Sequence, residues 1–305
     1  MAPRPALIGI DWGTTSFRAY QIAADGMIID TVEAAEGIAN PPAGGFEETF
    51  ERHVGPWLDD GAPLPVVASG MISSRNGWRE TPYLKAPADA AAFGASLTEH
   101  VSEAGRRLHF VSGLICDDAS GNPDVMRGEE TQLIGCMALG VPDGLFVMPG
   151  THSKWAMTQN GRLLGFRTYM TGEVFAVMRA HSLLGAFIGC EAWSEAAFAN
   201  GVAASLADKD SVLHRLFTVR SRVLDQRMAA DDTAAYLSGI LIGEELRAGL
   251  ADLAGDAELT VVGAGALVDR YLAALAVAGV AARPASDAAV ARGHYEIAKR
   301  AGLLA

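Results

Sequence analysis

A strand, a Gly-Thr turn and a second strand occur together twice in this sequence, and each time a glycine hairpin leads into a third strand. The first copy is LIGIDWGTTSFRAYQIAADGMIIDTVE at 7–33, and the second is LFVMPGTHSKWAMTQNGRLLGFRTYM at 145–170. The Asp-Gly and Asn-Gly pairs between alternating strands are typical of β-hairpins. Gly13-Thr14-x-Ser16 in the first copy lines up with Gly150-Thr151-x-Ser153 in the second. The repeat predicts two halves that share one fold.

The rest of the chain mixes strands and helices. Apolar spacing predicts short buried strands at 65–72 and 108–115 and helices at 127–140, 171–187 and 231–255. It also predicts a strand, a glycine turn and a helix at 259–279, and a last helix at 294–305. Asp231 or Asp232 is expected to cap the 231–255 helix. The mixture predicts the α/β class with mixed sheets and a domain boundary near 138–144.

Composition limits what such a chain binds. At 305 residues and 50% hydrophobic content it fills two cores. The net charge of −12 argues against a nucleic-acid or anionic-membrane partner. We find no signal-peptide core or membrane span, which favours the cytoplasm. Cys116, Cys136 and Cys190 lack metal-ligand spacing and are interpreted as reduced core thiols.

The two Gly-Thr turns carry the chemistry. Such a turn directs backbone N–H groups and hydroxyls at a phosphate. If the two halves face each other, both turns meet one polyphosphate, and Asp11 holds the accompanying Mg²⁺ through water. A plain hairpin is the alternative for either turn alone. A P-loop is excluded, because no G-x-x-x-x-G-K-[ST] occurs and the turns lead into strands.

A third glycine motif, VVGAGALVDRYLAAL, places Gly263 and Gly265 between a strand and a helix. One interpretation is half of a dinucleotide fingerprint, with Asp287 as the ribose-binding acid, although Val268 occupies the third glycine position. The other is a glycine turn against which an adenosine lies flat.

The order of these motifs resembles the sugar kinase, actin and Hsp70 superfamily. The segments SGMISSRNGW, VMRGEETQLIG, FVMPGTHSKW, FRTYMTGE and YLSGILIGEE narrow the resemblance to the 2-dehydro-3-deoxygalactonokinase family. This resemblance implies two duplicated ribonuclease H-like (actin-like ATPase) domains: 1–140, joined by the C-terminal helix 288–305, and 141–287. An active-site cleft between them is expected to close on its ligands.

The resemblance also implies an activity, the ATP- and Mg²⁺-dependent phosphorylation of the 6-hydroxyl of 2-dehydro-3-deoxy-D-galactonate. It assigns Asp11 to the metal, Gly13, Thr14 and Thr15 to the first phosphate motif, Gly150, Thr151, Ser153 and Lys154 to the second, and Gly263, Ala264 and Gly265 to adenosine. Glu129 and Glu130 begin the helix that carries the catalytic base. We favour Glu130, because Thr131 follows it as in the Asp-Thr of hexokinases. The alternative is that both merely favour the helix N-terminus.

The substrate is itself a carboxylate, so a guanidinium is expected in its site. Arg127 is the first choice, followed by Arg167 and Arg75, whereas Arg18 is placed on a strand face. We expect polar contacts from Ser69, Ser73 and Asn76 and apolar contacts from Trp78 and Trp12. Any one of these residues has a structural role as its alternative.

Rival functions remain at this point. A nicotinamide-dependent dehydrogenase would use the Gly263 turn with Asp287. A non-catalytic sugar-binding regulator is disfavoured, since only six residues precede Leu7 and no helix-turn-helix fits there. Within the superfamily, the Glu129-Glu130 pair also suits another sugar kinase or an exopolyphosphatase-like phosphohydrolase. The expected partner is a small sugar acid, and a homodimer is compatible with the sequence.

Overall fold

The computed structural model describes residues 3–39, 44–59, 63–188, 193–207, 210–252 and 259–304. Contacts divide the chain into two compact units. Unit 1 comprises residues 1–143, 157–165 and 286–305, and unit 2 comprises residues 144–156 and 166–285. Cys190, interpreted above as a core thiol, and Leu253, within the helix predicted at 231–255, lie outside the described residues.

Unit 1 contains a six-stranded mixed sheet in the order β3-β2-β1-β4-β7-β6. Its strands are β1 (Pro5–Trp12), β2 (Phe17–Ala23), β3 (Ile28–Ala34), β4 (Val66–Ser69), β6 (Thr98–Val101) and β7 (Arg107–Phe110). The antiparallel β1-β2-β3 meander confirms the strands predicted from the first repeat. β4 joins β1 in parallel, and β7 joins β4 in parallel.

A second, three-stranded sheet in unit 1 has the order β5-β8-β9. Its strands are β5 (Tyr83–Lys85), β8 (Gly113–Asp117) and β9 (Pro123–Met126). The single strand predicted at 108–115 is therefore wrong, because β7 ends at Phe110 and β8 begins at Gly113 in another sheet. Gly113 lies against the backbone of β9, where an added Cβ would be 2.6 Å from the carbonyl oxygen of Met126. Hydropathy alone does not reveal this change of sheet.

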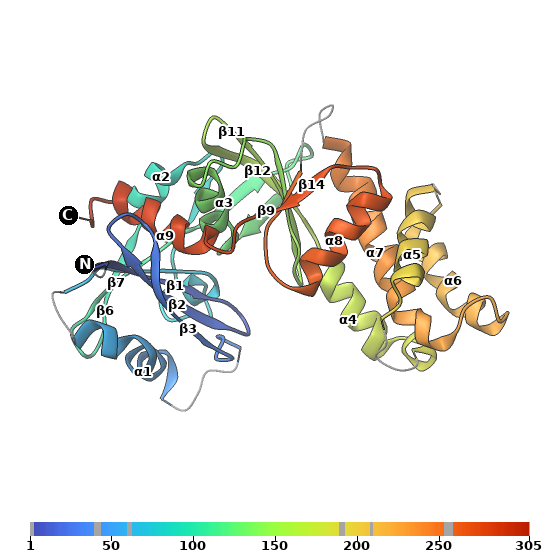
Figure 1. The fold of residues 1–305 in the computed structure, drawn as a ribbon, viewed down its shortest axis with the longest axis horizontal. Coiled ribbons are helices and arrows are strands. Elements are labelled where there is room, and N and C mark those ends of the chain that lie inside the picture. Colours follow the sequence, from blue (N-terminus) through green and yellow to red (C-terminus); the bar gives the residue numbers. More distant parts are fainter. Residues whose placement is uncertain are drawn as a thin grey trace. The chain divides into compact units, whose positions relative to one another are not determined.

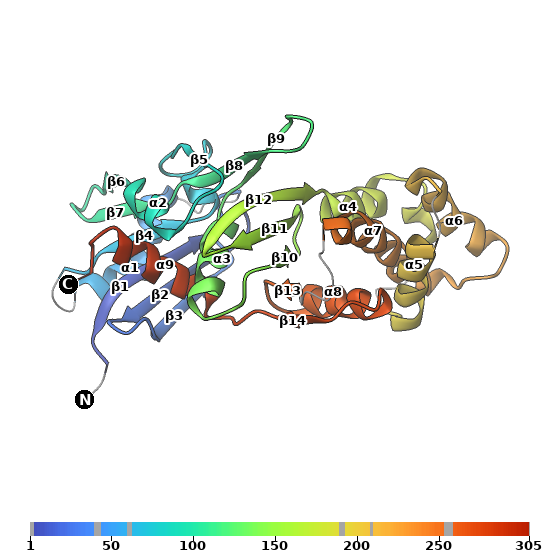
Figure 2. The ribbon, with the colours of Figure 1, turned by 90° about the horizontal axis from the view of Figure 1, so that it is seen from above.

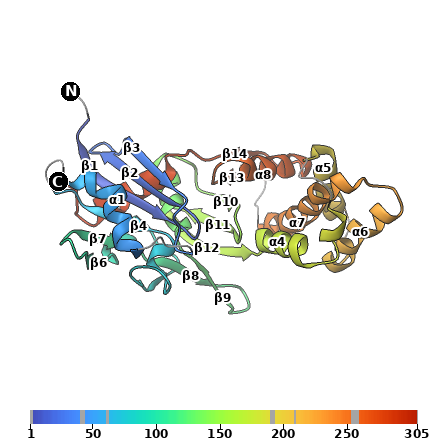
Figure 3. The same ribbon diagram turned by 90° about the horizontal axis from the view of Figure 1, so that it is seen from below.

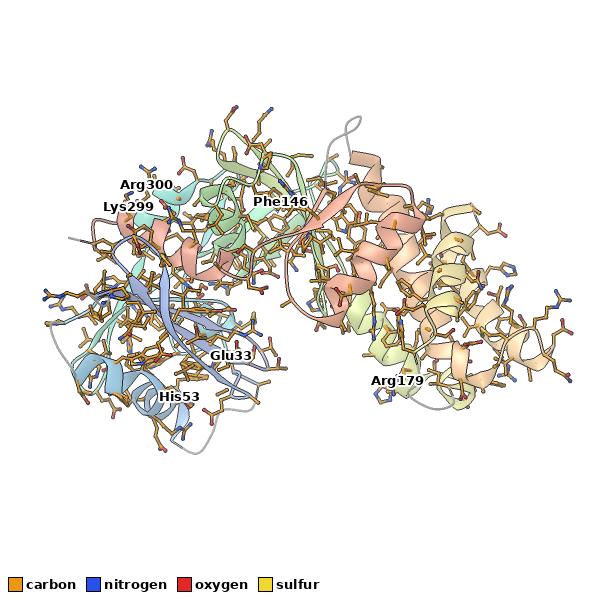
Figure 4. The ribbon with its side chains drawn as sticks, viewed as in Figure 1. Glu33, His53, Phe146, Arg179, Lys299 and Arg300 are labelled. Carbon is orange, nitrogen blue, oxygen red and sulfur yellow. The ribbon has the colours of Figure 1, made fainter. Side chains whose placement is uncertain are left out.

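Helices cover both faces of the large sheet in unit 1. They are α1 (Gly45–Asp59), α2 (Ala90–Ala95), α3 (Glu129–Ala138) and α9 (Ala289–Arg300). α1 lies on one side of β1 to β3 and α9 on the other (Figure 1). α9 begins earlier than the predicted 294–305 helix and ends with Lys299 and Arg300, which Figure 4 labels.

The two faces of β1 carry different side chains. Ile8, Ile10 and Trp12 alternate along the strand and pack in the core with Phe50 of α1. Gly9 and Asp11 occupy the opposite face. There α9 comes so close that a Cβ at Gly9 would be 2.8 Å from Nδ1 of His294. The face that carries Asp11 is therefore the one shared with the C-terminal helix.

The third sheet has five strands in the order β12-β11-β10-β13-β14. Its strands are β10 (Leu145–Met148), β11 (Ser153–Gln159), β12 (Arg162–Tyr169), β13 (Leu259–Val261) and β14 (Ala282–Pro284). The parallel pairing of β10 with β13 corresponds to that of β1 with β4 in unit 1. The strand order of the second repeat thus matches that of the first, as the duplicated motif predicts. The three mixed sheets with flanking helices confirm the α/β class.

The helices of unit 2 gather into one bundle around α7 (Figure 3). They are α4 (Thr171–His181), α5 (Glu195–Ala207), α6 (Val212–Leu224), α7 (Thr233–Gly249) and α8 (Ala266–Val277). Asp232 stands at the N-cap position of α7, one of the two positions predicted, but its side chain makes no capping hydrogen bond because its backbone is already helical. Among the described residues, no helix has the length and hydrophobicity needed to cross a membrane.

Candidate active site

Asp11 lies at the carboxyl end of β1, next to the first Gly-Thr turn. In the sheet register Asp11 is opposite Arg18 of β2 and opposite Ser69 of β4. Burial raises the pKa of Asp11 to about 6; the charge of Arg18 opposes this shift and that of Glu129 adds to it. Arg18 also forms an ion pair with Glu33 of β3 at 3.4 Å (Glu33 is labelled in Figure 4). The register therefore places the guanidinium of Arg18 near Asp11. From the sequence, Arg18 is expected only on a strand face, with no role in the site.

Two glycines bring the start of α3 close to Asp11. Gly70 follows β4 with φ +93°, and an added Cβ would be 2.8 Å from the carbonyl oxygen of Trp12 and 3.3 Å from Oδ1 of Asp11. Gly128 precedes α3 with φ +111°, and its Cβ would be 3.1 Å from Cα of Gly70. A side chain at either position would push the segments apart. The glycines in SGMISS and MRGEET thus have a packing role that spacing alone did not reveal.

Glu129 and Glu130 both turn back onto the backbone before α3. The N–H of Arg127 donates to Glu129 at 3.0 Å, and the N–H of Gly128 donates to both oxygens of Glu130 at 2.8 Å. Glu130 has no exposed surface, and burial, followed by the charge of Glu129, raises its pKa to about 8. Glu129 is only partly buried. Accessibility therefore favours Glu129 as the carboxylate that meets a substrate, the reverse of the choice suggested by the Asp-Thr pattern.

The first Gly-Thr turn is closed by a hydrogen bond from the N–H of Gly13 to the carbonyl of Ser16 at 2.9 Å. Thr14, Thr15 and Ser16 are exposed, so their hydroxyls are available to a ligand. Gly37 supports the turn from behind, where a Cβ would be 2.2 Å from the carbonyl oxygen of Thr14. The next two residues donate their N–H groups to the carbonyls of Gly13 and Thr14.

The second Gly-Thr turn is supported in the same way. A Cβ at Gly172, the second residue of α4, would be 2.4 Å from the carbonyl oxygen of Gly150. The N–H of Glu173 donates to the carbonyl of Thr151 at 3.0 Å, and His152 Nε2 lies 2.5 Å from the Glu173 carboxylate. Each repeat therefore ends in a glycine that packs on its own turn, Gly37 after β3 and Gly172 after β12. The sequence analysis missed this part of the repeat, although both glycines follow the third strand closely.

Ser153 and Lys154 lie behind the second turn. Ser153 is buried, and its Oγ is 2.7 Å from the hydroxyl of Tyr271 on α8. Lys154 is buried too, with Nζ 3.4 Å from the carbonyl oxygen of His152. Thr151 is exposed and Gly150 is partly exposed, whereas Ser153 anchors the turn to α8.

The adenosine motif joins β13 to α8. Gly263 and Gly265 have positive φ values of +138° and +71°, and Gly265 is the N-cap of α8. The turn from Gly263 to Gly265 is exposed, which leaves its backbone open to a flat ring. One small cavity in unit 2 is lined by Gly150, Thr171, Gly172, Phe175, Ser238, Leu241, Ile242, Leu267, Arg270 and Tyr271. The second turn and the first half of α8 therefore lie on the same cavity.

Arg270 is a cation on this cavity that the sequence analysis did not select. Its guanidinium carbon lies 3.7 Å from the ring centroid of Trp193, and burial lowers its pKa. The signal available in the sequence was the place of Arg270 one helical turn after Ala266, where α8 begins behind the glycine motif.

Arg127, the first choice for the substrate carboxylate, is instead bound by the protein. One terminal nitrogen is within hydrogen-bond distance of the Ser73 carbonyl, the Ser73 hydroxyl and the Thr81 hydroxyl, at 2.7, 2.9 and 2.6 Å, and the other donates to the Thr81 carbonyl at 3.1 Å. Its guanidinium also lies over the ring of Tyr83 at 4.4 Å. With both terminal nitrogens directed at these groups, Arg127 holds the 73–83 loop against the start of α3.

The other predicted substrate residues divide into two groups. Trp12 and Trp78 pack against each other with ring centroids 6.4 Å apart, in the core on the α1 face, and the indole N–H of Trp12 donates to the carbonyl of Glu36. Because successive residues of a strand point to opposite faces, Trp12 cannot share the face of Asp11. Ser69 is hydrogen-bonded to His294 at 2.9 Å. The exposed members of the set are Arg75, Asn76 and Arg167.

Comparison with known proteins gives the motifs their context. The sequence model described as 2-keto-3-deoxy-galactonokinase matches residues 11–297. The chain belongs to this family. A probable 2-dehydro-3-deoxygalactonokinase of Rhizobium meliloti (strain 1021) is 36% identical over 296 residues, 96% of each chain. The 2-dehydro-3-deoxygalactonokinase of Escherichia coli (strain K12) is 34% identical over 272 residues, 89% of this chain and 90% of its own.

A crystal structure from Sinorhizobium meliloti, described as a candidate 2-dehydro-3-deoxygalactonokinase, matches with a TM-score of 0.88 and 35% identity. The match covers 96% of this chain and 98% of the other. Membership of the 2-keto-3-deoxy-galactonokinase family identifies the chain as a kinase and decides against the nicotinamide-dependent dehydrogenase.

A kinase of this family is expected to use Mg²⁺ with its nucleotide. Mg²⁺ in such sites takes one or two carboxylates, water and substrate phosphates, instead of a cage of protein ligands. In keeping with this, the described part of the chain holds no group of three or more His, Cys, Asp or Glu arranged for a metal. The pKa of Asp11 is raised by burial and by the charge of Glu129, so a bound cation would relieve both effects. The residues present therefore fit one Mg²⁺ held with phosphate.

Proposed function

We propose that this chain is a cytoplasmic enzyme that transfers the γ-phosphoryl group of ATP to the 6-hydroxyl of 2-dehydro-3-deoxy-D-galactonate. The observation that carries the proposal is the approach of the start of α3, with Glu129 and Glu130, to Asp11, the acid that the exposed Gly-Thr turn follows along the chain. Phosphoryl transfer needs this combination of a metal-binding acid, a base and phosphate-binding N–H groups. The family membership and its named relatives supply the substrate class.

We propose that both turns bind one Mg·ATP. Thr14 and Thr15 of the first turn, and Gly150 and Thr151 of the second, direct N–H and hydroxyl groups at the phosphates, while the Gly263–Gly265 turn supports the adenosine. Asp11 binds the metal through water. When bound, Mg²⁺ neutralises charge on the transferring phosphoryl group.

The base in this proposal is a member of the Glu129-Glu130 pair. Glu129 accepts the proton of the attacking hydroxyl, because it combines exposed surface with a place near Asp11. Glu130 is buried behind it and, with a pKa of about 8, stays largely protonated at neutral pH. A neutral Glu130 adds no second negative charge beside the phosphates.

The carboxylate of the sugar acid requires a cation. Arg127 is bound to Ser73 and Thr81, so Arg18, Arg75 and Arg167 are the guanidiniums we propose for it. Arg18 has the clearest geometric support, since it lies opposite Asp11 in the register of β1 and β2.

The test is an ADP-release assay over a panel of 2-keto-3-deoxy sugar acids and simple hexoses, with the position of the phosphate checked by ³¹P NMR. We expect turnover on the C6 hydroxyl of the galactonate derivative. We expect Asp11→Ala and Glu129→Gln each to lower kcat by at least about 100-fold, as is usual for groups that act at the reacting atoms. Asp30→Asn removes an exposed carboxylate of β3 and is the matched control, with unchanged activity expected.

The same assay separates the alternatives. Turnover on another sugar would change the proposed acceptor but would leave the assignment as a kinase unchanged. Phosphate release from ATP or polyphosphate without any acceptor would identify a phosphohydrolase and overturn the proposed function. Full activity in Asp11→Ala would show that Asp11 is not needed for the reaction and would overturn the proposed active site.

A further inference from the structure

We infer that Glu245 of α7 is the positioning residue of the second Gly-Thr turn, which it holds for the nucleotide through a buried hydrogen-bond network. The inference deepens the proposed function, because it assigns a residue outside all three glycine motifs to nucleotide binding. Glu245 lies in YLSGILIGEE, the segment for which the motif analysis found no chemical role.

Three donors converge on this one carboxylate. The indole N–H of Trp155 on β11 donates to Oε1 at 2.7 Å. The hydroxyl of Tyr271 on α8 donates to Oε2 at 2.7 Å, and the hydroxyl of Thr171 at the start of α4 donates to the same oxygen. Glu245 itself is only 3% exposed. A carboxylate this deep is retained only where such donors replace its water.

The network has a fixed direction. An indole N–H can only donate, so the group at position 245 must accept. Because the Tyr271 hydroxyl donates to Glu245, the Ser153 hydroxyl, 2.7 Å away, donates to the oxygen of Tyr271. The chain of donors thus runs from Ser153 through Tyr271 to Glu245. Its origin is the residue that ends the Gly150–Ser153 turn.

The elements joined by Glu245 surround the cavity on which the turn lies. Thr171 precedes Gly172, whose missing side chain lets α4 support Gly150. Tyr271 belongs to α8, which begins at the Gly263–Gly265 turn. Gly150, Thr171 and Tyr271 all line that cavity. One carboxylate on α7 therefore sets the spacing between the turn, the helix behind it and the helix of the adenosine motif.

Burial adds to the argument from geometry. It raises the pKa of Glu245, while the bonds from Thr171, Trp155 and Tyr271 lower it. A leucine or methionine would fill the same space without this desolvation, so a role in stability alone does not require a carboxylate. An ionised carboxylate is needed at position 245 because it accepts hydrogen bonds from Trp155, Tyr271 and Thr171 at the same time and so holds all three in place.

The experiment compares Glu245→Gln with Glu244→Gln. The neighbouring Glu244 lies on the same helix, is partly buried, and pairs with the buried Arg215 and with Arg247, so its variant controls for the loss of a charge outside the Trp155–Tyr271–Thr171 network. In Glu245→Gln the amide nitrogen must meet a hydroxyl that previously donated, which reverses part of the network. We measure the Kd for Mg·ATP by calorimetry without any acceptor, the KM values for ATP and for the sugar acid, kcat and Tm.

We expect Glu245→Gln to weaken Mg·ATP binding by about tenfold, the effect of one charge-assisted hydrogen bond. The KM for the sugar acid should change less than about twofold. Glu244→Gln should leave all constants unchanged. Tyr271→Phe, which removes only the bridge from Ser153, should weaken Mg·ATP binding too, and adding it to Glu245→Gln should cause little further loss.

A lower Tm with an unchanged Kd for Mg·ATP would show that Glu245 has a merely structural role and would overturn the inference. Equal losses in both KM values, or full additivity with Tyr271→Phe, would contradict it as well. If Glu245→Gln does not fold, Tyr271→Phe gives the answer alone. Because the Kd is measured without acceptor, failure of the proposed substrate leaves this test intact.

Discussion

Neighbouring residues of β1 have opposite roles. Asp11 faces α9 and the start of α3, whereas Trp12 packs in the core on the α1 side. Strand periodicity alone requires this separation, so the expectation that Trp12 borders the substrate was avoidable. The placement of Arg18 opposite Asp11 also follows from strand register, once a four-residue turn is assumed. At this scale, local geometry decides which of two adjacent residues can do chemistry.

Glu130 provides a prediction at the residue scale, in the pH dependence of stability. Its pKa is about 8 in the folded protein against 4.5 for an ordinary glutamate, so between these values the native state binds more protons than the unfolded state. Stability from this group is complete below pH 4.5 and is lost as the pH rises through 8. At about 1.4 kcal/mol for each pKa unit, the upper limit of the loss is about 5 kcal/mol.

Glu130→Gln stays neutral, so we expect it to unfold at higher urea concentration than the wild type at pH 9 and at a similar concentration at pH 5. Urea unfolding at pH 5, 7 and 9 measures this, with Asp30→Asn as the control. Parallel pH curves for Glu130→Gln and the wild type would show that Glu130 is ionised in the folded protein.

Among elements, the pair α3 and α9 fixes the position of the two glutamates. The helices lie side by side (Figure 2). Glycines allow their backbones to approach: a Cβ at Gly135 would be 1.7 Å from the carbonyl oxygen of Ala289, and one at Gly293 would be 1.9 Å from that of Thr131. The helix that begins with Glu129 is therefore positioned by close backbone packing against the C-terminal helix.

We predict that Gly135→Ala and Gly293→Ala each destabilise the protein by about 1–3 kcal/mol, the usual cost of overpacking, and lower kcat. A displaced α3 moves Glu129 relative to Asp11. Gly55→Ala in α1 is the matched control: there a Cβ would meet only the flexible Glu51 carboxylate, at 3.1 Å. Because alanine is the better helix former by up to about 1 kcal/mol, that variant should be neutral or stabilised. Urea unfolding and kcat are measured together, and loss of stability in Gly55→Ala alone would contradict the argument.

For the whole molecule, the main consequence of the repeat is that two equivalent turns belong to different units. Each turn lies between the first two strands of its meander, and a glycine after the third strand packs against it. Duplication explains why the same arrangement, a Gly-Thr turn supported by a later glycine, appears in both units. If both turns bind the phosphates of one nucleotide, as we propose, the two units must act together in binding it.

Hydrogen exchange tests this at the scale of the molecule. On addition of Mg·ATP we expect amide exchange to slow by at least about tenfold at residues 13–16, 150–153 and 263–265. The sugar acid alone should protect residues 127–130 and leave 263–265 unchanged. Protection by Mg·ATP restricted to residues 150–153 and 263–265 would show that the first turn does not bind the phosphates.

Much of the fold was predictable from the sequence, because its signals are local. Hairpin glycines and alternating strands identified both meanders, and apolar spacing located α3, α4, α7 and α8. The change of sheet after Phe110 was not predictable in this way, because it depends on which segment packs nearby, and hydropathy does not record that.

The candidate site divides along the same line. The duplicated turns, the acid Asp11, the Glu129-Glu130 pair and the family can all be recognised from the sequence, because each is a short contiguous pattern. The folded chain was needed to find that Arg127 binds its own loop, that Glu130 is buried while Glu129 is accessible, and that Glu245 supports the second turn. Burial and hydrogen-bond partners come from residues distant in the chain, and these set which side chains remain available to a ligand.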